Sequence, residues 1–219
     1  MWSNSQRSSY AATLVVENKP GAGGRIGLEY LRGTDADGSS MILTPASMIV
    51  IYPWVYKKLS YDPFRECVPV ARVCKFSYAI TVGPAVPAGV KTIPDFVQWY
   101  KANPKQASYA IAAAGSGTHV AGVMLARASG VEMTSVAYKG GAPTIQEVIG
   151  GQIASSVSVL GEAMPFAAAG KLRILGTTRP TRSRFVPDVP AVKETYPDYV
   201  ADEWFGMFMP ASPEPHLLP

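Results

Sequence analysis

The chain has 219 residues, of which 47% are hydrophobic and 16% are charged, and its formal net charge is +4. This length and apolar content support a folded protein with a sizeable core and argue against a disordered chain. Lys and Arg are scattered rather than clustered, so we expect a small anion, not a nucleic acid, as the partner. Prolines interrupt the longest apolar stretch, MILTPASMIVIYPWVY, which argues against a membrane-spanning helix there.

The N-terminal third predicts several strands and one clear helix. Its first residues, MWSNSQRSSYAAT, have no extended apolar core and no clear cleavage site, so we expect no secretion signal in this chain. A Gly-rich turn in ENKPGAGG begins a helix that carries Ile26, Leu28 and Leu31. We interpret the later stretch GPAVPAGVKTIP as a connection between two lobes. Strands are expected at residues 13–16, 41–43, 68–73 and 78–82.

Strands and helices alternate through the rest of the chain. TIPDFVQWYKANP predicts a short helix with Thr92 as its N-cap. YAIAAAGSGTHVAG predicts a strand, a turn of small residues and a helix. This alternation predicts an α/β fold with a mainly parallel sheet that binds its ligand at the carboxyl ends of the strands. Further strands are expected at residues 134–136, at 153–159 and within KLRILGTT, and further helices are expected to end at Ile149 and Ala169.

The turn AAAGSGTH has the composition of an anion site. Gly115 and Gly117 allow a ligand to approach the backbone closely, and the first turn of the following helix leaves N–H groups unpaired. Those donors, the helix dipole and the hydroxyls of Ser116 and Thr118 favour a carboxylate. The alternative is that Ser116 or Thr118 only caps its own helix.

A second turn, YKGGAPT, repeats this design. Gly140 frees the backbone before a helix, and Lys139 is suited to pair with a second anionic group. A solvated lysine beside an ordinary turn is the alternative, and Tyr138 is equally suited to packing. The earlier cluster PGAGGRIG does not fit a dinucleotide site, because the third glycine of G-x-G-x-x-G would fall on Ile26.

No catalytic constellation is present in the sequence. The chain has two histidines, His119 and His216, and it lacks the G-x-S-x-G, H-E-x-x-H and G-x-x-x-x-G-K motifs. His119 follows Thr118 directly, and adjacent residues at a helix start point in different directions. We therefore expect no catalytic residue, no metal and no cofactor.

Several stretches in order resemble the Bug family, the periplasmic solute-binding receptors of tripartite tricarboxylate transporters. They are VVENKPGAGGRIGLEYL, YKKLSYDPF, SYAIAAAGSGTHVAGVML, VAYKGGAPTIQEVIGGQI, AGKLRILGTT, VPDVPAVKE and WFGMFMPAS. The resemblance implies a two-lobed, type II periplasmic-binding-protein-like α/β fold that closes on a small carboxylate. The family's first strand and Pro-Gly-Gly turn have no counterpart before TLVVENKP, and its C-terminal helices are lacking, so we expect an incomplete first lobe.

The resemblance implies a non-catalytic, monomeric receptor in the periplasm, with membrane transporter subunits as partners. Lobe one is expected at 13–82 and 204–219, and lobe two at 85–202. The alternatives are a ligand-sensing domain, a truncated relative that binds nothing, and an enzyme acting on small acids. The residues expected to hold the carboxylate are Gly115, Ser116, Gly117 and Thr118, and those expected to line the rest of the cleft are Thr44, Ser47, Tyr138, Lys139, Gly140 and Ser158.

Overall fold

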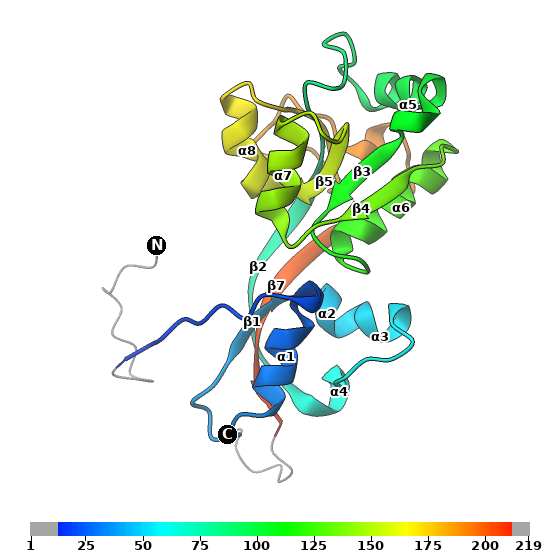
Figure 1. Ribbon diagram of the computed structural model, residues 1–219. Coiled ribbons are helices and arrows are strands. Elements are labelled where there is room, and N and C mark those ends of the chain that lie inside the picture. The colour runs from blue at the N-terminus through cyan, green and yellow to red at the C-terminus, as the bar shows by residue number, and fades with distance from the viewer. Residues whose placement is uncertain (1–12, 212–219) are drawn as a thin grey trace.

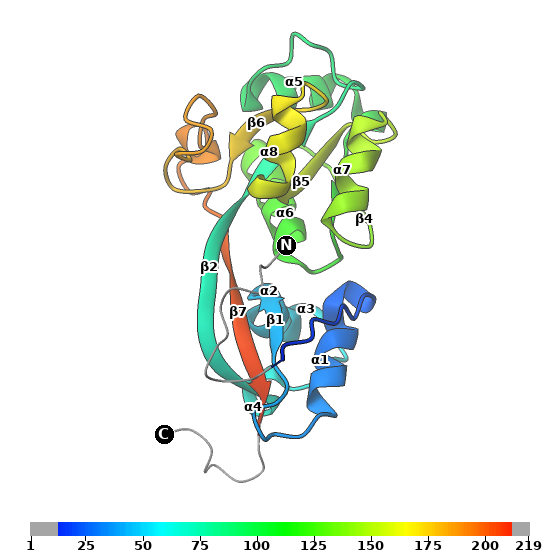
Figure 2. The same cartoon turned by 90° about the vertical axis from the view of Figure 1, so that its left-hand side faces the viewer.

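A computed structural model describes residues 13–211 as two lobes joined by two long strands (Figure 1). Strand β2 (Cys67–Val82) and strand β7 (Asp202–Pro210) pair antiparallel, from Cys67 opposite Pro210 to Ser77 opposite Asp202. Figure 2 shows both strands side by side where they pass between the lobes. The α/β, two-lobed fold expected from the sequence is therefore confirmed.

Strand β2 makes the crossing between the lobes. Its first part pairs with β7, and its last five residues, from Tyr78 to Val82, pair with β5 of the second lobe. The strands predicted at 68–73 and 78–82 are thus one strand, and the prediction that GPAVPAGVKTIP connects the lobes is wrong. That loop belongs to the second lobe, because Val86 and Val90 are buried in its core. The division of the chain into 13–82 with 204–219 and 85–202 stays a prediction, and residues 212–219 lie outside the described residues.

The first lobe packs short helices against β1 and β7. Leu28 and Leu31 of the first helix, Tyr52 and Tyr61 form the centre of its core. The strand predicted at 13–16 is wrong: this segment is irregular, and Leu14, Val15 and Val16 are 74–82% exposed. Within residues 13–211 no strand pairs with it, and β-branched residues favour a strand only where a neighbour covers them. The elements of this lobe are η1 (Ala22–Gly24), α1 (Arg25–Arg32), β1 (Ile42–Pro45), α2 (Ser47–Val50), α3 (Tyr52–Val55) and α4 (Pro63–Glu66).

The second lobe alternates strands and helices, as predicted. The capping box of α5 is present, with the Thr92 hydroxyl accepting from the Asp95 N–H at 3.2 Å. The elements are α5 (Ile93–Ala102), η2 (Pro104–Gln106), β3 (Ser108–Ile111), α6 (Gly117–Ser129), β4 (Thr134–Ala137), α7 (Gly141–Ile149), β5 (Ser155–Val159), α8 (Leu160–Ala168), β6 (Arg173–Thr177) and η3 (Val192–Glu194).

The sheet is mixed rather than mainly parallel. Its strand order is β1-β7-β2-β5-β3-β4, with β6 also paired to β2. Strand β3 pairs parallel with β4 and β5, whereas every named pair that includes β2 or β7 is antiparallel. The prediction of a mainly parallel sheet is wrong because the two crossing strands run in opposite directions between the lobes.

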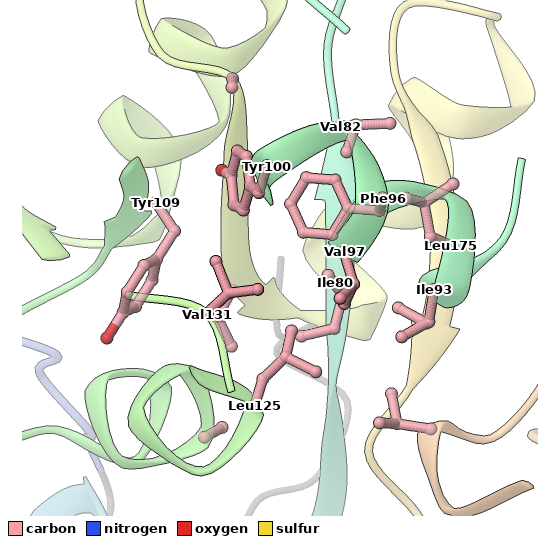
Figure 3. Close-up of a cluster of buried hydrophobic side chains, with 14 of the residues drawn as sticks. Ile80, Val82, Ile93, Phe96, Val97, Tyr100, Tyr109, Leu125, Val131 and Leu175 are labelled. Atoms are coloured by element: carbon pink, nitrogen blue, oxygen red, sulfur yellow. The ribbon is translucent and has the colours of Figure 1, made fainter. Parts of the chain in front are cut away.

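The main core lies in the second lobe, between its sheet and the helices α5 and α6 (Figure 3). Phe96 and Tyr100 of α5 are 1% and 0% exposed, and their ring centroids lie 4.2 Å apart. Leu125 of α6 and Ile80 of β2 pack into the same cluster. The core fixes α6 against the sheet and so fixes the position of the turn before it.

Within residues 13–211, no helix combines the length and the apolar character that crossing a bilayer requires.

Candidate functional site

The turn before α6 has the backbone expected of an anion site. Ser116 is the N-cap of α6, but its side chain makes no capping hydrogen bond. The Val120 N–H makes the first helical bond, to the Ser116 carbonyl at 3.0 Å, so the N–H groups that precede it in the helix have no intrahelical acceptor. The alternative that Ser116 caps its own helix is therefore wrong, and the N–H groups at the start of α6 are available to a ligand.

The two hydroxyls of this turn hold its shape. The Ser116 Oγ donates to the Ala113 carbonyl at 2.7 Å and lies 2.7 Å from the Thr118 Oγ1. The Thr118 Oγ1 in turn accepts from the Ala112 N–H at 3.3 Å. Since Ser116 donates its proton to Ala113, the Thr118 hydroxyl donates to Ser116. Both hydroxyl protons are thus used inside the turn, which leaves the backbone N–H groups as its free donors.

The first lobe contacts this turn directly. Gly115 has a φ of +76°, and a Cβ there would lie 3.2 Å from the ring of Tyr56. The Tyr56 hydroxyl donates to the Ala114 carbonyl at 2.7 Å. Gly23 also approaches it, since a Cβ at Gly23 would lie 3.3 Å from the Ala113 Cβ. Glycine is favoured at both positions because φ is positive, at +66° for Gly23 and +76° for Gly115, and because side chains of the first lobe leave little room for a Cβ.

A cavity of about 240 Å³ lies between the lobes and is lined by residues of α2, α6 and β7. Figure 1 shows α2 of the first lobe below α6 of the second lobe, close to β7. Two of the residues predicted for the site line it, Ser47 at the start of α2 and Gly117 at the start of α6. The Ser47 N–H donates to the Glu203 Oε1 at 2.5 Å. Glu203 is 7% exposed, and its burial raises the pKa of its carboxyl. The cavity walls are otherwise largely apolar, with Val50, Ile51, Val120, Met124 and Trp204 among them.

Two other predicted residues are buried in strands. The Thr44 Oγ1 donates to the Met48 Sδ at 2.8 Å, and the Ser158 Oγ lies 3.4 Å from the Ser156 Oγ. Both Thr44 and Ser158 are 2% exposed. Neither residue lines the cavity between α2 and α6. Their assignment to the ligand cleft stays a prediction.

The turn before α7 lies next to the turn before α6. The Gly140 N–H donates to the Ala112 carbonyl at 3.0 Å, and Ala112 also contacts Thr118. Gly140 has a φ of +108°, which a glycine adopts without strain. Lys139 is exposed, and the Tyr138 hydroxyl donates to the Glu147 Oε2 at 3.3 Å. The structure thus brings the two predicted turns together, whereas Tyr138, Lys139 and Gly140 lie outside the cavity lining.

His119 has a structural role in this turn. Its Nδ1 accepts from the Gly115 N–H at 3.1 Å, and its Nε2 lies 3.3 Å from the Ser135 Oγ. Partial burial lowers the pKa of the imidazole, so the ring is neutral near pH 7. Among residues 13–211, no group of three or more His, Cys, Asp or Glu residues is placed to hold a metal ion. The described groups are suited to hold an anion in place.

Sequence reasoning missed three residues near this site. Glu203 and Tyr78 lie beside Gly117, and Tyr56 bonds to the turn before α6. The one available signal was a single acid within the otherwise apolar stretch EWFGMFMP. The burial of Glu203 depends on contacts between segments that are distant in sequence. A pattern of neighbouring residues does not predict such contacts.

Residues 3–219 match the family described as "Tripartite tricarboxylate transporter family receptor". The chain belongs to this family. Among the family's relatives, Protein BugT of Bordetella pertussis is 26% identical over 97% of this chain. The gbd 5′ region protein of Cupriavidus necator is 29% identical over 94% of it. The chain spans 65% and 61% of the lengths of these two relatives.

Two solved structures have the same fold as this chain. The structure named "R. palustris Rpa4515 with adipate" superposes with a TM-score of 0.88 at 26% identity, over 93% of this chain and 68% of its own. "Structure of periplasmic binding protein BugD" gives a TM-score of 0.85 at 29% identity, over 93% of this chain and 67% of its own. One of these two structures is thus named as a periplasmic binding protein, and the other holds adipate, a dicarboxylate.

Proposed function

We propose that this family member is a periplasmic receptor that captures a small carboxylate between its lobes and delivers it to a tripartite tricarboxylate-type membrane transporter. The observation that carries the proposal is the start of α6, where uncapped N–H groups face the first lobe. Such a helix start attracts a carboxylate through its partial positive charge and its free donors. The adipate in the structural relative is a ligand of this chemical class.

The contact between the lobes supports a closing mechanism. Only β2 and β7 are continuous from one lobe to the other among the described elements, so a bend in two strands is sufficient to separate the lobes. A ligand that contacts both lobes favours the closed arrangement by its additional contacts. Capture and closure are therefore one coupled event, in which the protein acts as a monomer and no bond of the ligand is broken.

A thermal-shift screen tests this function. The full chain is heated with adipate, malate and other mono-, di- and tricarboxylates, and the matching amides are the neutral controls. A ligand at about a hundred times its dissociation constant stabilises the folded state by about 2.7 kcal/mol, which raises the unfolding temperature measurably. A shift with an acid and none with its amide supports the receptor. The absence of any shift in a cooperatively folding protein supports a relative that binds nothing, and turnover of a bound acid supports an enzyme.

A further inference from the structure

Two oxygens from the crossing strands lie against the first residue of α6. A Cβ placed on Gly117 would lie 2.0 Å from the Tyr78 Oη and 2.3 Å from the Glu203 Oε2. Tyr78 comes from β2 and Glu203 from β7. Both oxygens are thus adjacent to the helix start whose N–H groups have no intrahelical acceptor. This position belongs to the cavity between α2 and α6.

The unpaired Tyr78 hydroxyl indicates that a polar ligand binds in the cavity. Tyr78 is 2% exposed, and its Oη has no hydrogen-bond partner within residues 13–211. Buried hydroxyls are almost always hydrogen-bonded, since an unpaired one loses its bonds to water without compensation. The Tyr78 side chain lines the cavity, so a polar group that enters there can satisfy it.

The surroundings of Glu203 favour its neutral form. Glu203 makes no ion pair within residues 13–211. Its Oε1 accepts from the Ser47 N–H, and the Ser47 backbone and side chain favour the ionised carboxyl less strongly than burial disfavours it. A buried carboxyl without a cation holds its proton more strongly than one in water. Burial accordingly raises its pKa above the ordinary value of 4.5. A protonated carboxyl has an O–H that donates a hydrogen bond.

The titratable groups near Glu203 supply no positive charge. Tyr78 of β2 lies beside it at Gly117. Burial raises the pKa of Tyr52 of α3, and the charges of Tyr56 and Glu203 raise it further. The strand of Glu203 contributes the exposed Asp202. On α6, the His119 Nε2 lies 3.3 Å from the Ser135 Oγ, so this ring contacts Ser135.

Two basic side chains on neighbouring elements either contact another group or are exposed. The Arg25 guanidinium of α1 stacks over the Tyr56 ring at 4.3 Å from its centroid. Lys75 of β2, whose backbone is opposite Trp204, is exposed. No described cation therefore offsets a negative charge on Glu203.

We propose that Glu203 meets the ligand as a carboxylic acid, which donates a hydrogen bond to the carboxylate at the start of α6 while Tyr78 donates a second one. This inference rests on the proposed function, because it assigns two further residues to the same site. A carboxylate bound here accepts from the helix N–H groups, the Glu203 O–H and the Tyr78 O–H. An ionised Glu203 would instead repel it at close range. The ligand is thus captured together with a proton whenever the free protein holds Glu203 ionised.

This assignment has a measurable consequence for affinity. Below the pKa of Glu203 in the free protein, the affinity for a fully ionised acid is independent of pH. Above it, each pH unit lowers the affinity by about tenfold, because one proton must be taken up with each ligand. Glu203→Gln keeps an oxygen for the Ser47 N–H and places a permanent N–H₂ donor at the position of Oε2. This variant should bind with the low-pH affinity of the unchanged protein at every pH.

The test is calorimetric titration with adipate, and with each other acid that shifts the unfolding temperature, from about pH 6 to about pH 9. The unchanged chain is compared with Glu203→Gln and Tyr78→Phe, and Glu132→Gln, an exposed carboxyl before β4, is the matched control. Unfolding curves without ligand establish that each variant is folded. We expect a falling affinity with pH in the unchanged chain and the control, a flat profile in Glu203→Gln, and about tenfold weaker binding by Tyr78→Phe.

Each outcome separates the two proposals. Binding of acids with the same pH profile in the unchanged chain and in Glu203→Gln overturns the role of Glu203 and leaves the receptor function in place. Loss of binding by a folded Glu203→Gln at every pH also overturns it, because the ionised carboxylate would then be the required form. Binding of none of the acids at any pH overturns the receptor function and this inference together.

Discussion

Replacing Gly117 with alanine tests how closely α6 approaches the crossing strands. The new Cβ would lie 2.0 Å from the Tyr78 Oη and 2.3 Å from the Glu203 Oε2, both far inside van der Waals contact. Neither side chain can turn into solvent, because Tyr78 is 2% and Glu203 is 7% exposed. The ends of these two side chains must therefore shift within the cavity that they line, or the helix start must move away from β2 and β7.

Overpacking of this kind costs about 1–3 kcal/mol of unfolding free energy. For a chain of this size, each kcal/mol lowers the unfolding temperature by about 2–4 °C. We therefore expect Gly117→Ala to unfold several degrees lower and to bind carboxylates more weakly, since its N–H groups are displaced from the site. Calorimetry gives the unfolding temperature, and titration gives the affinity.

Gly161 supplies the matched control. It lies in the first turn of α8, and a Cβ there would meet nothing within 4 Å. Gly161→Ala should leave the protein equally stable or stabilise it by up to about 1 kcal/mol, through the better helix propensity of alanine. Combining Gly117→Ala with Tyr78→Phe removes the oxygen nearest to the new Cβ, so the loss should become smaller. An unchanged unfolding temperature for Gly117→Ala, or an equal loss in the Tyr78→Phe background, would refute the close approach.

Three other substitutions test the turn, the buried carboxyl and the core. Thr118→Val removes the acceptor of the Ala112 N–H and should lower the unfolding free energy by about 1–3 kcal/mol and weaken carboxylate binding; unfolding and titration together check this. For Glu203, the raised pKa means that its contribution to stability is complete below the unfolded value of 4.5 and is lost as pH rises through the folded pKa. Urea unfolding should thus show the unchanged chain losing stability relative to Glu203→Gln as pH rises; parallel curves would contradict this. Phe96→Ala removes a ring that is 1% exposed and should cost about 3–5 kcal/mol in the same assay; a loss below about 1 kcal/mol would contradict its place in the core.

Local sequence signals were sufficient for the elements whose contacts are local. Thr92 and Asp95, which are three residues apart, predict the capping box of α5. Consecutive small residues predict the turn before α6. Gly130 ends that helix in the left-handed conformation. The helix starts at Gly117 and Gly141 could therefore be predicted closely, as could the neighbouring strands β3 to β6.

Contacts between distant segments decided what the sequence could not predict. The continuity of β2 depends on its pairing with β7, which brings Cys67 opposite Pro210. The segment 13–16 has the composition of a strand, but pairing rather than propensity determines whether a strand forms. Glu203 is buried because α2 and α6 close over it from different lobes, and neither helix lies near it in the sequence.

The hydrogen bond from Tyr56 to the Ala114 carbonyl joins the lobes through protein groups alone, and this has a consequence for kinetics. A ligand that binds between lobes already in contact must wait for them to separate. Its observed association rate should then level off at high concentration, at the rate of opening, instead of rising in proportion to concentration. Tyr56→Phe removes this bond and should raise the limiting association rate. Stopped-flow mixing with increasing adipate concentrations would measure this rate. Under the proposed function, the speed of uptake would be set by a tyrosine that the ligand does not need to touch.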